Sequence, residues 1–107
     1  MNEQRIAMLK QFMEDDPTDP FNIYALAVEY YEEKTTSSLQ LFEQLLTKHR
    51  NYLPTYYKAA HLYWETEQWN KAEEVFKKGI ALAEAQNEQK ALQELKSAYS
   101  NFQFDQM

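Results

Sequence analysis

His61 and Glu65 come nearest in this sequence to the spacing of a chemical site, because residues four apart share one face of a helix. An imidazole and a carboxylate can both ligate a metal ion, but a metal site needs at least a third ligand. No third ligand is indicated, because His49 falls in another predicted helix. The pair is therefore interpreted as a groove histidine beside a surface carboxylate, without a metal.

Other residue types that carry enzyme chemistry are absent or wrongly spaced. Asp15, Asp16 and Asp19 lack the spacing of a calcium-binding loop and fit helix capping. Gly79 is the only glycine, so no glycine-rich phosphate-binding loop can form. The chain has no cysteine, which excludes disulfide bonds, thiolate ligands and a cysteine nucleophile. We therefore predict a protein that is not an enzyme, with no catalytic residue, metal ion or cofactor.

Composition indicates the class of protein and argues against two classes of partner. With 107 residues, 44% hydrophobic and 15% aromatic, and only one Gly and three Pro, the chain is expected to be one packed, mainly helical domain. The net charge of −6 argues against nucleic acid, because binding phosphates needs a basic surface. Charged residues recur along residues 1–15, so this segment is expected to be neither a signal peptide nor a membrane span, and a cytoplasmic location is favoured.

Two apolar stripes at helical spacing dominate residues 56–80. The first stripe has the spacing i, i+3, i+4 and i+7 and consists of Tyr56, Ala59, Ala60 and Tyr63. The second has the same period and consists of Ala72, Val75, Phe76, Gly79 and Ile80. Small residues in both stripes allow two helices to approach closely, with the aromatic residues filling the space around them. The segment is therefore predicted to form two packed helices joined by a short turn.

This pattern resembles the tetratricopeptide repeat, whose 34-residue signature runs W-x2-L-G-x2-Y, then A-x3-F, then P. The signature positions are matched in order by Tyr56, Ala59, Ala60, Tyr63, Ala72 and Phe76. An earlier copy matches with Ile23, Leu26, Ala27, Tyr30, Ser38 and Phe42. The two Phe residues are 34 residues apart but the two Tyr residues 33, so one residue is missing from the first turn. Loops absorb such a change more easily than helices do.

The remaining segments resemble incomplete repeats. Residues 1–16 form half a repeat or a capping helix, with a packing face of Ile6, Leu9, Phe12 and Met13. Near the other end, Leu92, Leu95 and Tyr99 have signature spacing within a polar helix that suits the cap of a solenoid. Phe102 and Phe104 are expected to fold back onto the protein.

Helix starts are predicted from capping residues. Asp19 is an N-cap candidate followed by Pro20 in the first helical position. Ser37 and Gln40 have the spacing of a capping box, and Asn87 is the N-cap candidate of the last helix. The resemblance implies an all-α, right-handed α-solenoid forming a single domain over 1–107. Its parts are an N-terminal helix at 1–16, repeats at 20–50 and 53–85, and a capping helix at 87–104.

In tetratricopeptide folds the first helices of successive repeats line a concave groove, and the resemblance implies one here. A second apolar stripe on the first helix of repeat 1 consists of Phe21, Tyr24, Val28 and Tyr31. Its counterpart in repeat 2 consists of Pro54, Tyr57, His61 and Trp64. Glu32 and Glu65 would add an acidic edge, and Lys58 lies nearby. Aromatic anchors with a polar rim are typical of binding hot spots.

The resemblance predicts a protein-interaction module, an adaptor or scaffold that binds a protein or peptide. Tetratricopeptide domains that capture the C-terminal carboxylate of chaperones use Lys, Arg and Asn, whereas Tyr24, Val28, Tyr57 and His61 stand at most of those places here. An apolar ligand carrying Lys or Arg is therefore favoured. Two alternatives stay open: the stripes pack only on neighbouring helices or the tail, or they form a homodimer contact.

Overall fold

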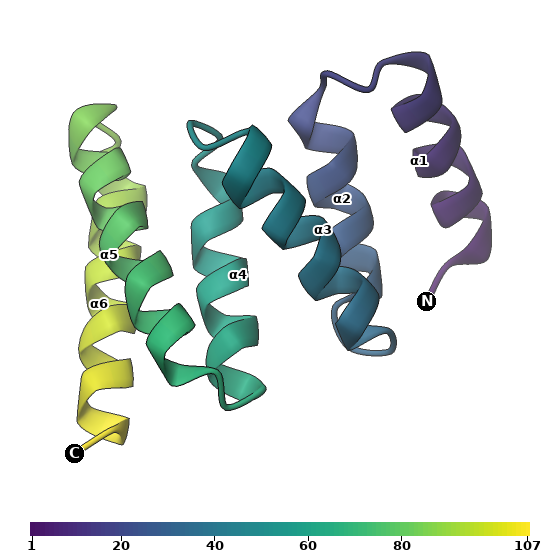
Figure 1. Cartoon of the computed structure of the whole chain (residues 1–107). Coiled ribbons are helices and arrows are strands. Elements are labelled where there is room, and N and C mark those ends of the chain that lie inside the picture. Colours follow the sequence, from purple (N-terminus) through teal and green to yellow (C-terminus); the bar gives the residue numbers. More distant parts are fainter. The chain divides into compact units, whose positions relative to one another are not determined.

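The structure, a computed structural model, describes residues 1–107 and consists of six helices without strands (Figure 1). The helices are α1 (Glu3–Asp15), α2 (Pro20–Tyr30), α3 (Thr35–Lys48), α4 (Pro54–Glu65), α5 (Trp69–Ala85) and α6 (Gln89–Asp105). The expected all-α fold is confirmed. No helix has both the length and the apolar character needed to cross a membrane.

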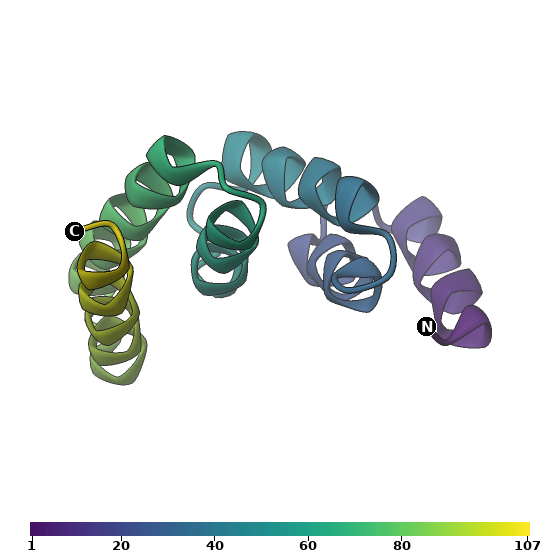
Figure 2. The same ribbon diagram turned by 90° about the horizontal axis from the view of Figure 1, so that it is seen from below.

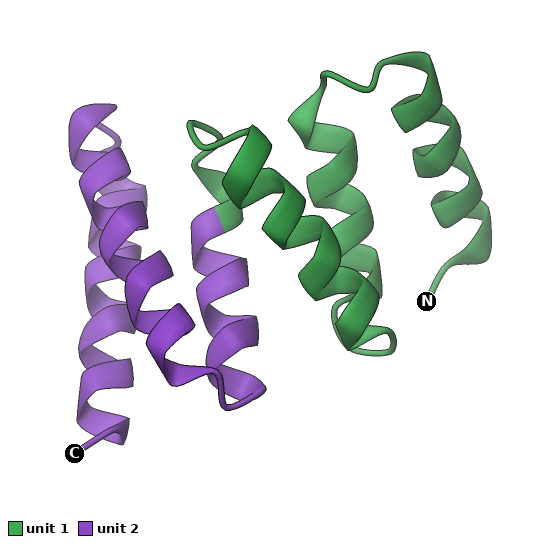
Figure 3. Cartoon of the chain, viewed as in Figure 1, with its two compact units in different colours: residues 1–55 green, residues 56–107 purple.

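The helices group into two compact units, residues 1–55 and residues 56–107 (Figure 3). That the two units form one domain stays a prediction. Both tryptophans, Trp64 and Trp69, belong to the second unit. Unfolding followed by tryptophan fluorescence therefore reports that unit, while circular dichroism reports both, and coincident transitions would support one domain.

In the first unit, α2 packs against both α1 and α3. The core between α1 and α2 consists of Ile6, Leu9, Ala25, Leu26 and Tyr30, with Met13 and Leu41 packed against it. The prediction that Phe12 belongs to this packing face is wrong, because Phe12 is 45% exposed. One helical face is wide enough for Ile6, Leu9 and Met13 but leaves Phe12 at its edge.

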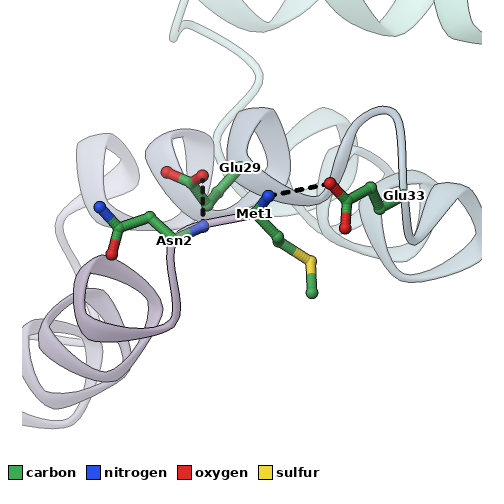
Figure 4. Close-up of polar contacts among 4 residues, drawn as sticks. All are labelled: Met1, Asn2, Glu29 and Glu33. Atoms are coloured by element: carbon green, nitrogen blue, oxygen red, sulfur yellow. Dashed lines mark hydrogen bonds and ion pairs between the residues drawn. The ribbon is translucent and has the colours of Figure 1, made fainter.

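Polar contacts also fix α1 beside the end of α2 (Figure 4). The Met1 ammonium lies 2.9 Å from a Glu33 carboxylate oxygen, and the Asn2 N–H donates to Glu29 at 3.3 Å. The hydrogen bond and charge of Glu33 raise the pKa of this ammonium. Arg5 adds an ion pair to Glu29 at 3.0 Å. Arg5 and Glu33 are exposed and Glu29 is half-buried, so these contacts orient the chain more than they stabilise it.

Between α2 and α3, the signature position for a small residue is held by Ser38. Its side chain is fully buried, and its hydroxyl donates to the Ala27 carbonyl oxygen at 2.6 Å. A buried hydroxyl without a partner would destabilise the fold, so this bond explains why Ser replaces Ala. The neighbouring Phe42 is also fully buried, as the signature predicts.

In the second unit, α5 packs against both α4 and α6 (Figure 2). Ala59, Ala60 and Ala72 are fully buried. A Cβ placed on Gly79 would lie 2.7 Å from Cβ of Tyr56, closer than side chains tolerate. The predicted close approach of α4 and α5 at small residues is confirmed.

Two predicted helix starts are wrong. The helix α3 begins at Thr35, and the Lys34 carbonyl already accepts from the Ser38 N–H at 3.0 Å, which places Ser37 inside the first turn. No side chain caps α3, so Ser37 and Gln40 form no capping box. The helices α3 and α5 begin at equivalent positions of the two repeats, because in α5 the Ala72 N–H likewise donates to the Gln68 carbonyl oxygen. By contrast, Asp19 and Pro20 begin α2 as predicted.

The N-cap of α6 is Glu88 and not Asn87. Asn87 instead has a φ of 59° and ends α5, where the Glu88 N–H bonds to Ala83 and the Asn87 N–H to Glu84. These two bonds define a Schellman motif, which needs a left-handed residue at this place. Asn tolerates the left-handed conformation better than most residues, which explains why Asn87 lies in the turn that ends α5 and does not cap α6.

Candidate functional site

A row of three aromatic rings runs along the exposed side of α4. Tyr57, His61 and Trp64 follow one another with ring centroids 4.3 Å and 5.7 Å apart. The imidazole Nδ1 of His61 lies 2.8 Å from the Tyr57 carbonyl oxygen, which fixes the ring against its own helix. Tyr57 is 39% exposed, and His61 and Trp64 are half-buried. The row therefore offers flat apolar surface to solvent in a fixed order.

The row is held from behind by α5 and α6. The Trp64 ring meets Phe102 edge-on at 5.4 Å, and both Trp64 and His61 contact Phe76. The Trp64 indole N–H also donates to a carboxylate oxygen of Asp105 at 2.8 Å. Aromatic edge contacts and a charge-assisted hydrogen bond together hold the indole in one orientation. This part of the surface is thus preorganised.

The row forms one wall of a groove of about 380 Å³ between α4 and α6, which we call the α4–α6 groove. The facing wall comes from one side of α6 and consists of Lys90, Gln93, Glu94, Ser97, Ala98 and Asn101. An aromatic wall opposite a polar wall can bury apolar side chains of a ligand and bond its polar groups.

A second hollow, of about 620 Å³, adjoins the C-terminal ends of α4 and α6. We call it the Trp69 pocket; its lining consists of His61, Trp64, Glu65, Glu67, Trp69, Asp105 and Gln106. Trp69 is the first residue of α5, and its side chain is 46% exposed. The α4–α6 groove and the Trp69 pocket share His61 and Trp64, so they meet at these two rings.

Next to the core of this unit, α5 and α6 share a polar contact. The Tyr99 hydroxyl donates to Glu73 at 3.1 Å, and burial together with this bond raises the pKa of Tyr99. The Tyr99 ring also packs on Phe76 and Phe102. The contact fixes α6, and thereby the polar wall of the α4–α6 groove, against α5.

The stripe predicted on α2 is partly used for packing within the first unit. Tyr24 contacts Phe42 at 6.3 Å and Tyr52 at 5.9 Å, and burial raises the pKa of its hydroxyl. Tyr31 meets Phe42 edge-on at 6.3 Å. By contrast, Phe21 and Val28 are 55% and 37% exposed. The stripe therefore divides into two packed aromatic residues and two exposed apolar ones.

The structure brings together only some of the predicted site residues. Tyr57, His61 and Trp64 line the α4–α6 groove, while Glu65 lines the Trp69 pocket. Glu32 is exposed and Lys58 half-buried, and neither lines these two hollows. The assignment of these residues to a binding site stays a prediction.

The sequence-based prediction missed the polar wall on α6 and the contribution of Trp69. Gln93, Ser97 and Asn101 recur every four residues, a signal for one shared helix face that was interpreted only as a solvated cap. The predicted fold-back is right for Phe102, which is buried, and wrong for Phe104, which is 77% exposed. Both belong to α6, and one helix face cannot bury residues only two positions apart.

Comparison with known proteins identifies the family. Residues 29–98 match the tetratricopeptide repeat family. A tetratricopeptide repeat domain protein from Salinibacter ruber, solved by solution NMR, is 35% identical over 81% of this chain and 89% of its own, with a TM-score of 0.75. A crystal structure of a tetratricopeptide repeat domain protein from the same organism is 34% identical over 79% of this chain and 96% of its own, also with a TM-score of 0.75. Among curated proteins, none matches. The chain belongs to the tetratricopeptide repeat family, whose domains are in general protein–protein interaction modules.

Proposed function

We propose that the protein is an adaptor or scaffold that binds a segment of a partner protein in the α4–α6 groove. The observation that carries the proposal is the row of Tyr57, His61 and Trp64 facing the polar side of α6. Rings fixed from behind need little further ordering when a ligand binds, which favours affinity. Aromatic anchors beside polar side chains are the usual composition of a binding hot spot.

The size and chemistry of the α4–α6 groove suit a short peptide or one face of a helix. Its volume of about 380 Å³ holds a few side chains and falls in the range of ligand pockets, about 300–1,000 Å³. Gln93, Ser97 and Asn101 offer donors and acceptors to the ligand backbone. We also propose the cytoplasm as the location of the protein.

Selection from a displayed library of random peptides tests this proposal. Peptides enriched on the protein should lose at least about tenfold in affinity for Tyr57→Ala, because removing an exposed aromatic anchor typically weakens binding by 1–2 kcal/mol or more. Phe104→Ala is the matched control, since Phe104 is exposed and does not line the α4–α6 groove. Enriched peptides that bind the Tyr57→Ala variant as well as the parent protein would overturn the proposal.

Self-association through the same rings is a second candidate, supported by exposed apolar side chains including Phe21, Tyr57 and Trp69. Mass in solution, measured over a wide range of concentrations, distinguishes the two candidates. A dimer that Tyr57→Ala dissociates would place the homodimer first. A monomer at all concentrations would instead favour binding of a partner protein in the α4–α6 groove.

A further inference from the structure

We propose that the Trp69 pocket binds the guanidinium group of an arginine side chain carried by the partner protein. The inference names the chemistry of the partner and rests on the proposed function for the existence of that partner. The Trp69 pocket adjoins the α4–α6 groove at His61 and Trp64. One bound segment can therefore place an apolar side chain in the groove and an arginine in the pocket.

Two indole rings, those of Trp64 and Trp69, line the Trp69 pocket. The Trp64 indole is fixed by its hydrogen bond to Asp105, and the Trp69 side chain is 46% exposed. A planar guanidinium is attracted to the face of an indole and is weakly hydrated, so it loses little on leaving water. The rings therefore favour arginine over a neutral polar side chain.

The charged side chains that line the Trp69 pocket are all acidic. Its lining includes the carboxylates of Glu65, Glu67 and Asp105, and no lysine or arginine. The nearby Lys71 instead has its ammonium 5.6 Å from the ring centroid of Tyr63. The C-terminal ends of α4 and α6 add partial negative charge beside the Trp69 pocket, and the N-terminal end of α5, which begins at Trp69, adds partial positive charge. The helix ends partly offset one another, so the three carboxylates determine the negative sign of the Trp69 pocket and attract a cation.

Arginine fits this arrangement better than lysine does. Its guanidinium presents several N–H donors in one plane, so it can stack on an indole while donating to carboxylates at its edge. Lysine carries a compact, strongly hydrated charge that cannot do both. A comparison of arginine binding with lysine binding therefore tests the proposal directly.

The two indole N–H signals in a ¹H–¹⁵N NMR spectrum provide the readout, because Trp64 and Trp69 are the only tryptophans. N-acetyl-arginine methylamide is the probe, with the lysine analogue and the neutral citrulline analogue as controls. We expect both indole signals to shift saturably with the arginine probe, more weakly with lysine and not with citrulline, and the shifts to shrink as salt is raised. No shift with arginine, or equal shifts with lysine or citrulline, would overturn the assignment.

The Glu67→Gly variant distinguishes an effect on arginine binding from an effect on the stability of the protein. Glu67 has a φ of 61°, which glycine adopts without strain, so the variant should melt at a higher temperature than the parent protein. It should nevertheless bind the arginine probe about threefold more weakly, the effect of losing one exposed charge pair. Asn87→Gly is the matched control, since Asn87 also has a positive φ but lines neither hollow, and its binding should be unchanged. Unchanged probe binding in Glu67→Gly would contradict the proposal.

A probe that consists of one blocked amino acid keeps the two hypotheses distinguishable. Peptide selection can succeed at the α4–α6 groove while the arginine probe fails, which would leave the proposed function standing without its arginine. The reverse outcome, saturable arginine binding without selected peptides, would support the Trp69 pocket and remove the groove as the binding site.

Discussion

The two repeats share their packing positions but differ in the turn that joins their helices. In repeat 1 the helix α2 ends at Tyr30, and no residue before α3 has a positive φ. In repeat 2 the turn is one residue longer, and Glu67 has a φ of 61°. There the Gln68 N–H bonds to Tyr63 and the Glu67 N–H to Trp64, the two bonds of a Schellman motif.

This difference places residues on the surface that the repeat signature does not describe. The longer turn carries Glu67 and leads into Trp69, whereas Thr35 occupies the equivalent position in repeat 1. Both Glu67 and Trp69 line the Trp69 pocket. In this chain the packing positions therefore determine the fold, while the turn creates part of the candidate site.

The largest expected effect comes from the equivalent residues Phe42 and Phe76, both fully buried. Replacing either with Ala should lower the free energy of unfolding by about 3–5 kcal/mol, the usual range for a buried Phe. Phe76→Ala should have the larger effect, because Phe76 contacts the rings of four residues whereas Phe42 contacts two.

Denaturant unfolding of both variants measures the difference, and Lys77→Ala is the control. Lys77 is exposed, so its replacement should change the free energy of unfolding little. Equal losses for Phe76→Ala and Lys77→Ala would show that the register of α5 is wrong.

Gly79→Ala should have the next largest effect. An added Cβ would lie 2.7 Å from Cβ of Tyr56, so α4 and α5 would have to separate, at a cost of about 1–3 kcal/mol. In repeat 1 the positions equivalent to Gly79 and Tyr56 are held by Leu45 and Ile23, both buried, so there the larger side chain is on α3 and the smaller one on α2. Thermal unfolding decides the sign, because helix propensity alone would make Gly79→Ala stabilising. A higher melting temperature would contradict the close approach.

Much of this fold could be predicted from the sequence because helix packing leaves a periodic pattern. Ala59, Ala60 and Ala72 are fully buried as the spacing predicted. The starts of α3 and α6 could not be predicted in the same way, because a short polar residue satisfies several local roles. Asn87 suits both an N-cap and a left-handed turn, and only the hydrogen bonds of the folded chain decide between them.

The candidate site was harder to predict than the fold. Tyr57, His61 and Trp64 were recognised because they form an apolar stripe that the core does not need. Their partners on α6 are polar, and nothing in a polar helix face distinguishes a groove wall from a solvated surface. Whether Trp69 packs inside or lines a hollow depends on how the turn before it folds, which helical periodicity does not encode.

A smaller effect is expected at Ser38 and its counterpart Ala72. Ser38→Ala removes the buried bond to the Ala27 carbonyl and should lower the free energy of unfolding by about 1 kcal/mol. The equivalent carbonyl in repeat 2 belongs to Ala60. Ala72→Ser should therefore be tolerated if α4 and α5 approach as α2 and α3 do, because its hydroxyl finds the same acceptor. Denaturant midpoints of both variants test this, and a severe loss for Ala72→Ser would show that the two helix pairs differ.

The smallest effect concerns a charge pair that only repeat 2 possesses. The Lys78 ammonium lies 2.7 Å from Glu74, and its hydrogen bond and charge lower the pKa of that carboxyl. Because the folded pKa is depressed, the pair stabilises the protein at pH values above the unfolded pKa of Glu74, and this contribution is lost as pH falls through the folded pKa. Glu74→Gln should therefore melt slightly below the parent protein at neutral pH, with the difference vanishing in acid.

Repeat 1 has Gln40 and Gln44 at the positions of Glu74 and Lys78, so the same pair can be installed there. The double variant Gln40→Glu/Gln44→Lys should raise the melting temperature slightly at neutral pH and low salt, because oppositely charged residues four apart attract on a helix surface. The gain should disappear at high salt, where exposed charges are screened. A gain that persists in high salt would mean that the new side chains stabilise α3 by packing and not by charge, and the two repeats would then differ in more than this pair.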